Sequence, residues 1–186
     1  SINFSARNGV AKVNSVVDFA FLEYCLREDL NDHAQRAMAV LKPIKLIIDN
    51  YPEDATEEFD VENNPKDENA GTRKVSFSRE LWIEEEDFME VPAPKYFRLF
   101  PGNEVRLKSA YVVKCVSCDH DAEGNVTAVH CTYDPDSRGG NTLDGRKIKS
   151  TIHWVDAKTA VDGEIRLYDR LFTKSKIGRA SCRERV

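Results

Sequence analysis

Several features that mark enzymes and membrane proteins are missing from this 186-residue sequence. No stretch approaches the ~18 consecutive apolar residues of a membrane-spanning helix, and no charged-then-apolar leader is present. There is also no glycine-rich nucleotide loop, no internal repeat and no Ser/His/Asp or Cys/His set at a distinctive spacing. The hydrophobic content of 41% is typical of a globular domain. We therefore expect a globular chain that has no membrane partner and no catalytic residues of its own.

Cysteine is sparse, with five residues, but its spacing raises the question of a metal site. Cys115 and Cys118 form a C-x-x-C pair, and His130 with Cys131 follows downstream, so four zinc ligands are available. Residues 111–119, however, have the pattern of a strand, on which positions three apart point to opposite faces. We therefore expect no metal ligands here, and instead free, partly buried thiols in a reducing cytosol.

A helical pattern stands near the start of the chain. Phe19, Leu22, Leu26 and Leu30 recur at spacings of three and four, which places them on one stripe of a helix. The spacing predicts a helix over residues 15–30, with Ser15 as its N-cap.

After residue 37 the dominant period is two, as in half-buried strands. The clearest local pattern is a hairpin of residues 111–119 and 126–134, joined by the turn Ala122-Glu-Gly-Asn125. Further strands are expected at residues 44–48, 56–61, 72–77, 81–85, 148–155 and 164–168. Many short strands without intervening helices predict a mainly β fold, an antiparallel β-barrel preceded by a short α-helical segment.

The charge distribution is uneven. The net charge of −5 argues weakly against nucleic-acid binding, and residues 49–68 hold nine acids and one lysine. Residues 95–114, in contrast, carry a net charge of +4, and residues 138–149 a net charge of +3. A basic patch on an acidic body can steer a polyanion to one face of a protein.

The first basic stretch also contains aromatic residues. Tyr96, Phe97 and Phe100 alternate with Lys95 and Arg98, which offers unstacked RNA bases a flat surface, hydrogen-bond donors and positive charge. On composition alone, the same pattern also fits an ordinary solvated sheet face.

The other conspicuous aromatic and imidazole side chains are expected to be structural. Trp82 and Trp154 lie in alternating strand patterns and are predicted to pack in the core or on a barrel face. His153 is predicted to be hydrogen-bonded structure, whereas His33 and His120 are predicted to lie in polar turns.

Two dense blocks of sequence bracket the strand-rich part. The first contains Cys25-Leu-Arg-Glu-Asp-Leu-Asn31 and Lys45-Leu-Ile-Ile-Asp-Asn-Tyr51, and the second contains Ile152-His-Trp-Val155 and Glu164-Ile-Arg-Leu-Tyr-Asp-Arg-Leu-Phe172. Together they resemble the C-terminal half of glutaminyl-tRNA synthetases, over about residues 3–173. The resemblance implies the end of a helical subdomain at residues 1–36 and a proximal anticodon-binding β-barrel at residues 37–175.

The last residues, 176–186, do not continue this pattern. They resemble the in-frame translation of a sequencing adapter, so we expect this tail to be foreign to the domain and to add nothing to its fold.

The resemblance also implies anticodon-binding residues. In the family, an arginine in the segment that opens the barrel helps to read the middle anticodon base, and its match is Arg36. An arginine that reads the third base is matched by Arg98, and two basic residues that contact the first base and its phosphates are matched by Arg106 and Lys108. Lys108 replaces an arginine. Lys95 and Pro65 are weaker candidates, because the sequence around each departs from the best-known family member.

The implied function is that of one portion of an enzyme. The whole enzyme would join glutamine to its tRNA with ATP and Mg²⁺, as a cytoplasmic monomer. The His-Ile-Gly-His-like and Met-Ser-Lys-like ATP signatures of that enzyme class are absent here, so we expect an internal fragment that binds tRNA and needs no cofactor itself. Two alternatives stay open: a fragment of an archaeal- or eukaryotic-type glutamyl-tRNA synthetase, and a stand-alone β-barrel module that binds protein.

Overall fold

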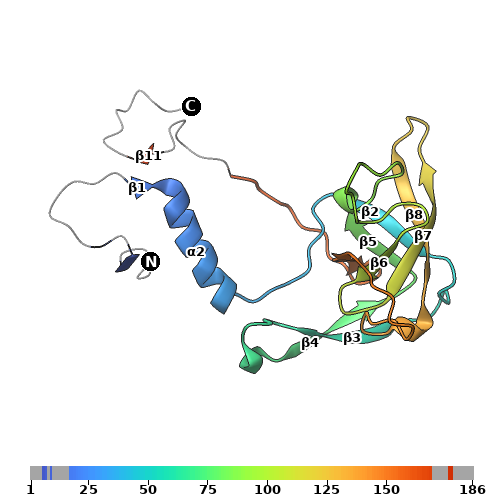
Figure 1. Ribbon diagram of the computed structural model, residues 1–186, viewed down its shortest axis with the longest axis horizontal. Coiled ribbons are helices and arrows are strands. Elements are labelled where there is room, and N and C mark those ends of the chain that lie inside the picture. Colours follow the sequence, from blue (N-terminus) through green and yellow to red (C-terminus); the bar gives the residue numbers. More distant parts are fainter. Residues whose placement is uncertain (1–5, 8, 10–16, 169–175, 178–186) are drawn as a thin grey trace. The chain divides into compact units, whose positions relative to one another are not determined.

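Figure 1 shows the computed structural model, which describes residues 6–7, 9, 17–168 and 176–177. The chain divides into two compact units: unit one comprises residues 1–36, 64–71 and 164–186, and unit two comprises residues 37–63 and 72–163. In the described part of the chain, no helix is both long enough and apolar enough to cross a membrane. The domain limits expected from the sequence stay a prediction.

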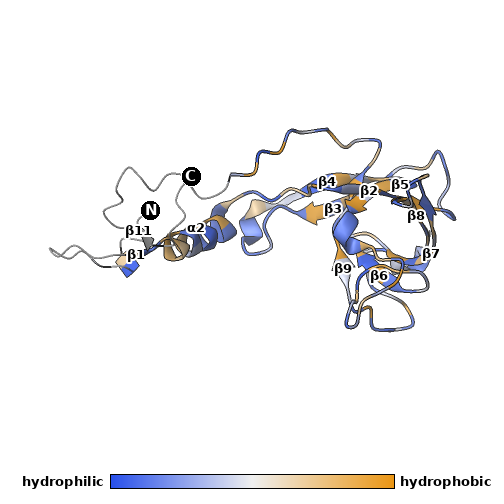
Figure 2. Ribbon diagram, turned by 90° about the horizontal axis from the view of Figure 1, so that it is seen from above, coloured by the Kyte–Doolittle hydropathy of each residue, from blue (hydrophilic) through white to orange (hydrophobic). Residues whose placement is uncertain are grey.

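Unit one is built around the helix α2, Phe19–His33. The predicted helix is therefore confirmed, but the predicted N-cap was wrong: Asp18 has extended backbone, and its carboxylate accepts a hydrogen bond from the Ala20 amide at 3.0 Å. The reason is that a carboxylate oxygen satisfies a free amide of the first turn, which lets the helix begin there. Ser15 lies outside the described residues. The helix carries both polar and apolar residues (Figure 2).

The rest of unit one is short. β1, Val17–Asp18, pairs antiparallel with β11, Lys176–Ile177, and the 3₁₀ turn η1 covers Glu68–Ala70. Residues 178–186 of the tail lie outside the described residues, so the expectation of a foreign tail stays a prediction. The strand expected at residues 164–168 is wrong, since no strand forms there and Ile165 and Leu167 stay exposed. An alternating pattern without a core to face gives no strand.

Unit two is a curled sheet of seven strands (Figure 1). Two neighbouring pairs, β2–β8 and β6–β9, are parallel, and the other neighbours are antiparallel. The strands, in sheet order, are β10 (Val155–Asp156), β5 (Glu80–Glu84), β2 (Pro43–Ile48), β8 (Val126–Tyr133), β7 (Val112–His120), β6 (Glu104–Leu107) and β9 (Thr151–Ile152). The expected mainly β, mostly antiparallel architecture is confirmed, as is the β7–β8 hairpin.

Four smaller elements complete unit two. β3, Glu57–Glu62, and β4, Thr72–Phe77, form a separate antiparallel pair, and two 3₁₀ turns, η2 and η3, cover Glu85–Asp87 and Pro135–Ser137. The positions expected for the first four strands therefore agree with β2 to β5 within a residue or two, because each has a clear alternation of buried and exposed side chains.

The most consequential difference from the sequence pattern concerns residues 148–155, which were expected to form one strand. They divide into β9, which pairs with β6, and β10, which pairs with β5. These partners lie at opposite ends of the sheet order, so the segment joins both sheet edges. Only two residues, His153 and Trp154, separate β9 from β10. Because each residue spans at most ~3.6 Å, the two edges must approach closely, which curls the sheet into a half-barrel. We call residues 151–156 the closure segment.

Trp154 fills the interior below this closure. Its side chain is fully buried, its indole N–H donates to the Lys108 carbonyl at 3.0 Å, and its ring meets that of Phe77 edge-on at 5.1 Å. Phe77 also packs edge-on against Tyr51, Phe59 and Tyr111. Edge-to-face contact between rings adds to the stability gained by burying their area. The prediction of a structural role for Trp154 is confirmed.

The cysteines of the hairpin depart from the sequence argument. β7 has a register shift between Cys115 and Ser117, where Val116 is the extra, exposed residue of a bulge. The bulge resets the alternation, so Cys115 is buried and Cys118 also packs against the core. The expectation that these two side chains point to opposite faces was therefore wrong. Among the described residues the four thiols are free, as expected, with Cys25 and Cys131 also buried.

The histidines also differ from expectation. His33 is the last residue of α2 and His120 the last of β7, so neither lies in a turn between elements. His130 bridges two carboxylates, with Nδ1 at 2.9 Å from Asp49 and Nε2 at 3.0 Å from Asp119. These hydrogen bonds raise the pKa of His130 and occupy both ring nitrogens, so the imidazole holds β8 to its neighbours.

The aromatic core gives a first prediction. Phe77→Ala removes a fully buried ring and should lower the free energy of unfolding by about 3–5 kcal/mol, because a cavity is left under Trp154. Phe97→Ala is the matched control, since the Phe97 side chain is half exposed, and it should change that free energy by less than about 0.5 kcal/mol. Urea unfolding of both variants measures the difference. Equal losses would contradict the assigned core.

Candidate nucleic-acid interface

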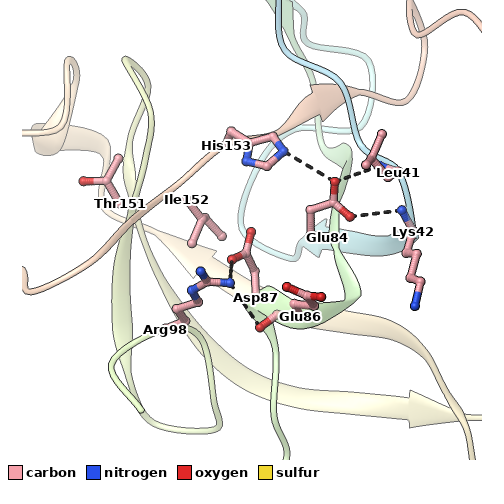
Figure 3. A pocket seen from close by; sticks show the side chains of 9 residues that line it. All are labelled: Leu41, Lys42, Glu84, Glu86, Asp87, Arg98, Thr151, Ile152 and His153. Carbon is pink, nitrogen blue, oxygen red and sulfur yellow. Dashed lines mark hydrogen bonds and ion pairs between the residues drawn. The ribbon is translucent and has the colours of Figure 1, made fainter. Parts of the chain in front are cut away.

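A pocket of about 380 Å³ opens beside the closure segment (Figure 3). Its walls come from four places in the chain: the entry to β2, the end of β5 with η2, the segment before β6 that carries Arg98, and the closure segment itself. The lining residues are Leu41, Lys42, Glu84, Glu86, Asp87, Arg98, Thr151, Ile152 and His153. The pocket therefore exists only because the sheet edges meet, and it is large enough for a small ligand or a nucleobase.

One wall of the pocket is fixed by Glu84. Its two carboxylate oxygens accept hydrogen bonds from the Leu41 and Lys42 amides at 2.7 and 3.0 Å (Figure 3). His153 Nε2 lies 3.7 Å from Glu84 and donates to the Ala39 carbonyl at 3.0 Å. The predicted structural role of His153 is confirmed. These contacts hold the chain entering β2 against the closure segment.

Arg98 stands at the opposite wall, paired with a buried carboxylate. Its Nη1 lies 2.8 Å from Asp87 Oδ1 and 3.4 Å from the Glu86 carbonyl (Figure 3). The Asp87 side chain is 7% exposed, whereas that of Arg98 is 49% exposed. In the described part of the chain, no hydrogen bond or ion pair engages Nε or Nη2 of Arg98. A fork of guanidinium donors is thus held in place and left open to a ligand.

The backbone that carries Arg98 is also fixed. The Asn103 side-chain amide donates to the Arg98 carbonyl at 2.7 Å, and the Leu99 amide donates to the Asp87 carbonyl at 3.0 Å. Lys95 has a positive φ of 68°, an uncommon conformation outside glycine that marks the turn into this segment. Phe97 is half exposed, with Lys149 Nζ 5.2 Å from its ring centre. A half-exposed aromatic ring therefore belongs to the residue next to Arg98 in the sequence.

Arg106 and Lys108 meet the other side of the closure segment. Arg106 Nη1 is 3.4 Å from the Thr151 hydroxyl, and its Nε donates to the Gly140 carbonyl. Gly140 has a φ of 89°, and a Cβ there would come within 2.5 Å of the Arg106 side chain, so only glycine fits beneath it. The Lys108 amide donates to the Ile152 carbonyl at 2.9 Å while its side chain stays exposed. Arg98, Arg106 and Lys108 therefore surround β9.

Two predicted site residues belong to unit one. Arg36 follows α2, and its Nη2 donates to the backbone and side-chain oxygens of Asn31 at 2.8 and 2.7 Å. Pro65 is exposed, next to the buried Asn64, whose amide donates to the Asp32 carbonyl at 2.8 Å. Arg98, Arg106 and Lys108 therefore lie in unit two, whereas Arg36 and Pro65 lie in unit one.

Comparison with known proteins identifies the family that has this sequence. A family described as tRNA synthetases class I (E and Q), anti-codon binding domain, matches residues 34–134, and a second family with the same description matches residues 151–183. The chain belongs to this family. The second match extends into the segment expected to be a foreign tail, and that expectation stays a prediction.

Curated relatives of this anticodon-binding domain include several proteins named Glutamine--tRNA ligase. The chain is 59% identical over 169 residues to that of Clostridium perfringens, covering 91% of the chain and 31% of the relative. It is 55% identical over 174 residues to that of Clostridium kluyveri, covering 94% and 31%. It is 57% identical over 169 residues to that of Bradyrhizobium diazoefficiens, covering 91% and 30%. The chain thus spans about a third of the length of these relatives.

The second basic stretch of the anticodon-binding domain is largely structural. Arg146 pairs with Glu104, Asp134 and Asp144 at 2.8–2.9 Å, and these partners raise its pKa. Arg138 lies 3.4 Å from Glu57, with its guanidinium over the Phe59 ring. Arg138 and Arg146 both contribute to the net charge of +3 over residues 138–149, and both are neutralised by acidic side chains of the same unit. Sequence reasoning missed these pairs because their partners lie up to 81 residues away.

The sequence also missed Asp87, Thr151 and Asn103 as parts of the site. Asp87 stood in an acidic run that reads as solvated surface, and only its burial behind Arg98 distinguishes it. The available signal was weak: Phe88 and Leu99, which flank the pair, are apolar residues that form a bridge and bury this stretch.

The Arg98–Asp87 pair predicts a pKa change. Burial raises the pKa of Asp87 above its ordinary value, and Arg98 opposes that rise. Arg98→Gln should therefore raise the pKa of Asp87 further, whereas Arg98→Lys should restore most of the opposing effect. Because the folded pKa is raised, ionisation of Asp87 costs stability as the pH rises from the unfolded to the folded value, and this loss should grow in Arg98→Gln.

An NMR titration of the Asp87 carboxyl carbon measures the pKa of Asp87 in Arg98→Gln and in Arg98→Lys, with Arg73→Gln, on β4, as the control. An unchanged pKa in Arg98→Gln would show that the two groups do not interact.

Proposed function

We propose that this chain is the anticodon-binding portion of a glutamine–tRNA ligase and that its pocket beside the closure segment receives one base of the anticodon. The observation that carries the proposal is the Arg98 guanidinium, which a buried carboxylate holds in place while half of its surface stays open at the pocket. A rigid arginine fork beside a cavity suits a base edge with two acceptors, which is the edge that guanine presents.

The third anticodon base for glutamine is guanine, so we assign Arg98 to that base. The half-exposed ring of Phe97 supports the assignment, because a base extruded from the anticodon loop needs a stacking partner. Three exposed cations of the same unit, Lys95, Lys108 and Lys149, suit phosphate oxygens, which need charge more than geometry.

The remaining candidates have different parts in this proposal. Arg106 is already engaged by Gly140 and Thr151, so it supports the pocket-lining Thr151 and adds charge near the first base. Arg36, fixed to the end of α2 by Asn31, is assigned to the middle base, with Pro65 near the loop. These two assignments rest on the family resemblance of their sequence positions.

The activity of the whole protein is part of the same proposal. It would attach glutamine to its tRNA, with ATP and Mg²⁺ used by a part of the protein outside this chain, as a cytoplasmic monomer. The name of the three curated relatives, Glutamine--tRNA ligase, supports glutamine over glutamate as the amino acid. No residue of this chain is assigned to catalysis or to a cofactor of that reaction.

Arg98→Lys in the full-length enzyme tests the base assignment. Lysine keeps the charge but loses the two-donor fork, so recognition of the cognate anticodon should weaken by roughly 1–3 kcal/mol, while a tRNA with its third anticodon base replaced should be affected much less. Aminoacylation kinetics with both tRNAs give the comparison, and Arg73→Lys on β4 serves as the control. Equal losses for the two tRNAs would remove Arg98 from the list of base readers.

Lys108→Ala should behave differently, because an exposed lysine contacts phosphate without reading sequence. Binding should weaken to a similar degree for all anticodons, and the log–log salt dependence should become shallower by about 0.7, as for one lost contact to single-stranded RNA. Equilibrium binding at several salt concentrations measures that slope. An unchanged slope would place Lys108 outside the interface.

A further inference from the structure

Three potential metal ligands meet at the far end of β7, apart from the pocket. His120 Nε2 lies 3.0 Å from Glu90 Oε2 and 3.9 Å from Cys118 Sγ, and the three ligand atoms all lie within 4.8 Å of one another. None of these residues belongs to the RNA site proposed above. All three belong to unit two.

The backbone of β7 produces this arrangement. Cys118 and His120 are two positions apart on the strand, so their side chains leave the same face. The bulge at Val116 turns that face toward the core at Cys118, and Glu90, in the segment after β5 and η2 of the same chain, reaches it from alongside. The side chains of His120 and Glu90 are 36% and 51% exposed, so an ion can enter from solvent.

We propose that Glu90, Cys118 and His120 form a zinc-binding site with one coordination position open to water. A tetrahedral zinc ion with bonds of about 2.0–2.3 Å separates its ligand atoms by about 3.4–3.6 Å. The Cys118–His120 separation of 3.9 Å is already close to that edge, and the His120–Glu90 separation of 3.0 Å needs to open by only a few tenths of an ångström.

The ligand types select the metal. A thiolate, an imidazole and a carboxylate together suit Zn²⁺, whereas Mg²⁺ and Ca²⁺ take oxygen ligands. A bound dication would compensate the negative charges of a Cys118 thiolate and of Glu90, which would otherwise repel each other. This set shares only Cys118 with the combination of Cys115, Cys118, His130 and Cys131 considered in the sequence, whose histidine is occupied by Asp49 and Asp119.

Such an ion would join two parts of unit two. Glu90 follows Met89, whose amide donates to the Leu99 carbonyl at 3.0 Å, next to Arg98. The ion would therefore tie the end of β7 to the segment that carries Arg98, and would act as a structural clamp on it. Its open position could also take a small anionic ligand in place of water.

Co²⁺ is the probe for this site, because tetrahedral cobalt bound to a thiolate gives a near-ultraviolet charge-transfer band and intense visible bands. The Cys182→Ser background removes the fifth thiol, which lies outside the described residues. Titration of this protein with CoCl₂ should produce both sets of bands at one equivalent, and ZnCl₂ should then abolish them by displacement.

Matched variants assign the ligands. Cys118→Ser should remove the charge-transfer band, and His120→Gln and Glu90→Gln should each weaken cobalt binding at least about tenfold, as loss of a metal-site group commonly does. His33→Gln, which replaces an exposed histidine on α2, should leave binding unchanged. The proposal would be overturned if the Cys182→Ser protein, with Glu90, Cys118 and His120 intact, gave no charge-transfer band. It would also be overturned if the band persisted after Cys118→Ser.

Discussion

The closure segment is the constraint on which the rest of unit two depends. Residues 151–156 pair with β6 through β9 and with β5 through β10, so one short stretch joins both edges of the curled sheet. Unpaired edges of a sheet are an aggregation hazard, and closure removes part of that hazard. The same closure places Trp154 in the interior and Thr151, Ile152 and His153 at the pocket. The same six residues therefore contribute both to stability and to the proposed base-binding site.

The charged residues of unit two fall into two groups: those that stabilise the fold and those that stay open to a ligand. Buried or half-buried acids are matched inside the unit: Asp156 accepts from Ser76 and Ser78, and Glu84 accepts from two amides at the entry to β2. Arg146 is likewise surrounded by three carboxylates. Cations used in this way are not available to RNA, so a count of basic residues overstates the interface. Arg98 differs because its buried partner leaves half of the side chain open.

Much of the fold could be predicted from the sequence, because its signals are local. The β7–β8 hairpin has strong alternation on both sides of a Gly124 turn, and α2 has a regular apolar stripe. Closure could not be predicted, because alternation over residues 148–155 does not show that the strand changes partners halfway.

The site was predictable in part. Arg98, Arg106 and Lys108 could be predicted from a sequence motif, and they lie around β9. The role of Asp87 is evident only from its burial behind Arg98. The bulge at Val116 had a similar effect on the cysteines, because one extra residue reversed the faces that strict alternation assigned. Long-range pairing and bulges thus set the limit of what periodicity can establish.

The central claim is that the third anticodon base enters the pocket formed by closure. A direct test is photo-crosslinking of the full-length enzyme to a tRNA that carries 6-thioguanosine at the third anticodon position, followed by mass spectrometry of the linked peptide. The account predicts crosslinks to residues 95–99 or 151–153, which line or adjoin the pocket. Crosslinks confined to other parts of the protein would contradict it.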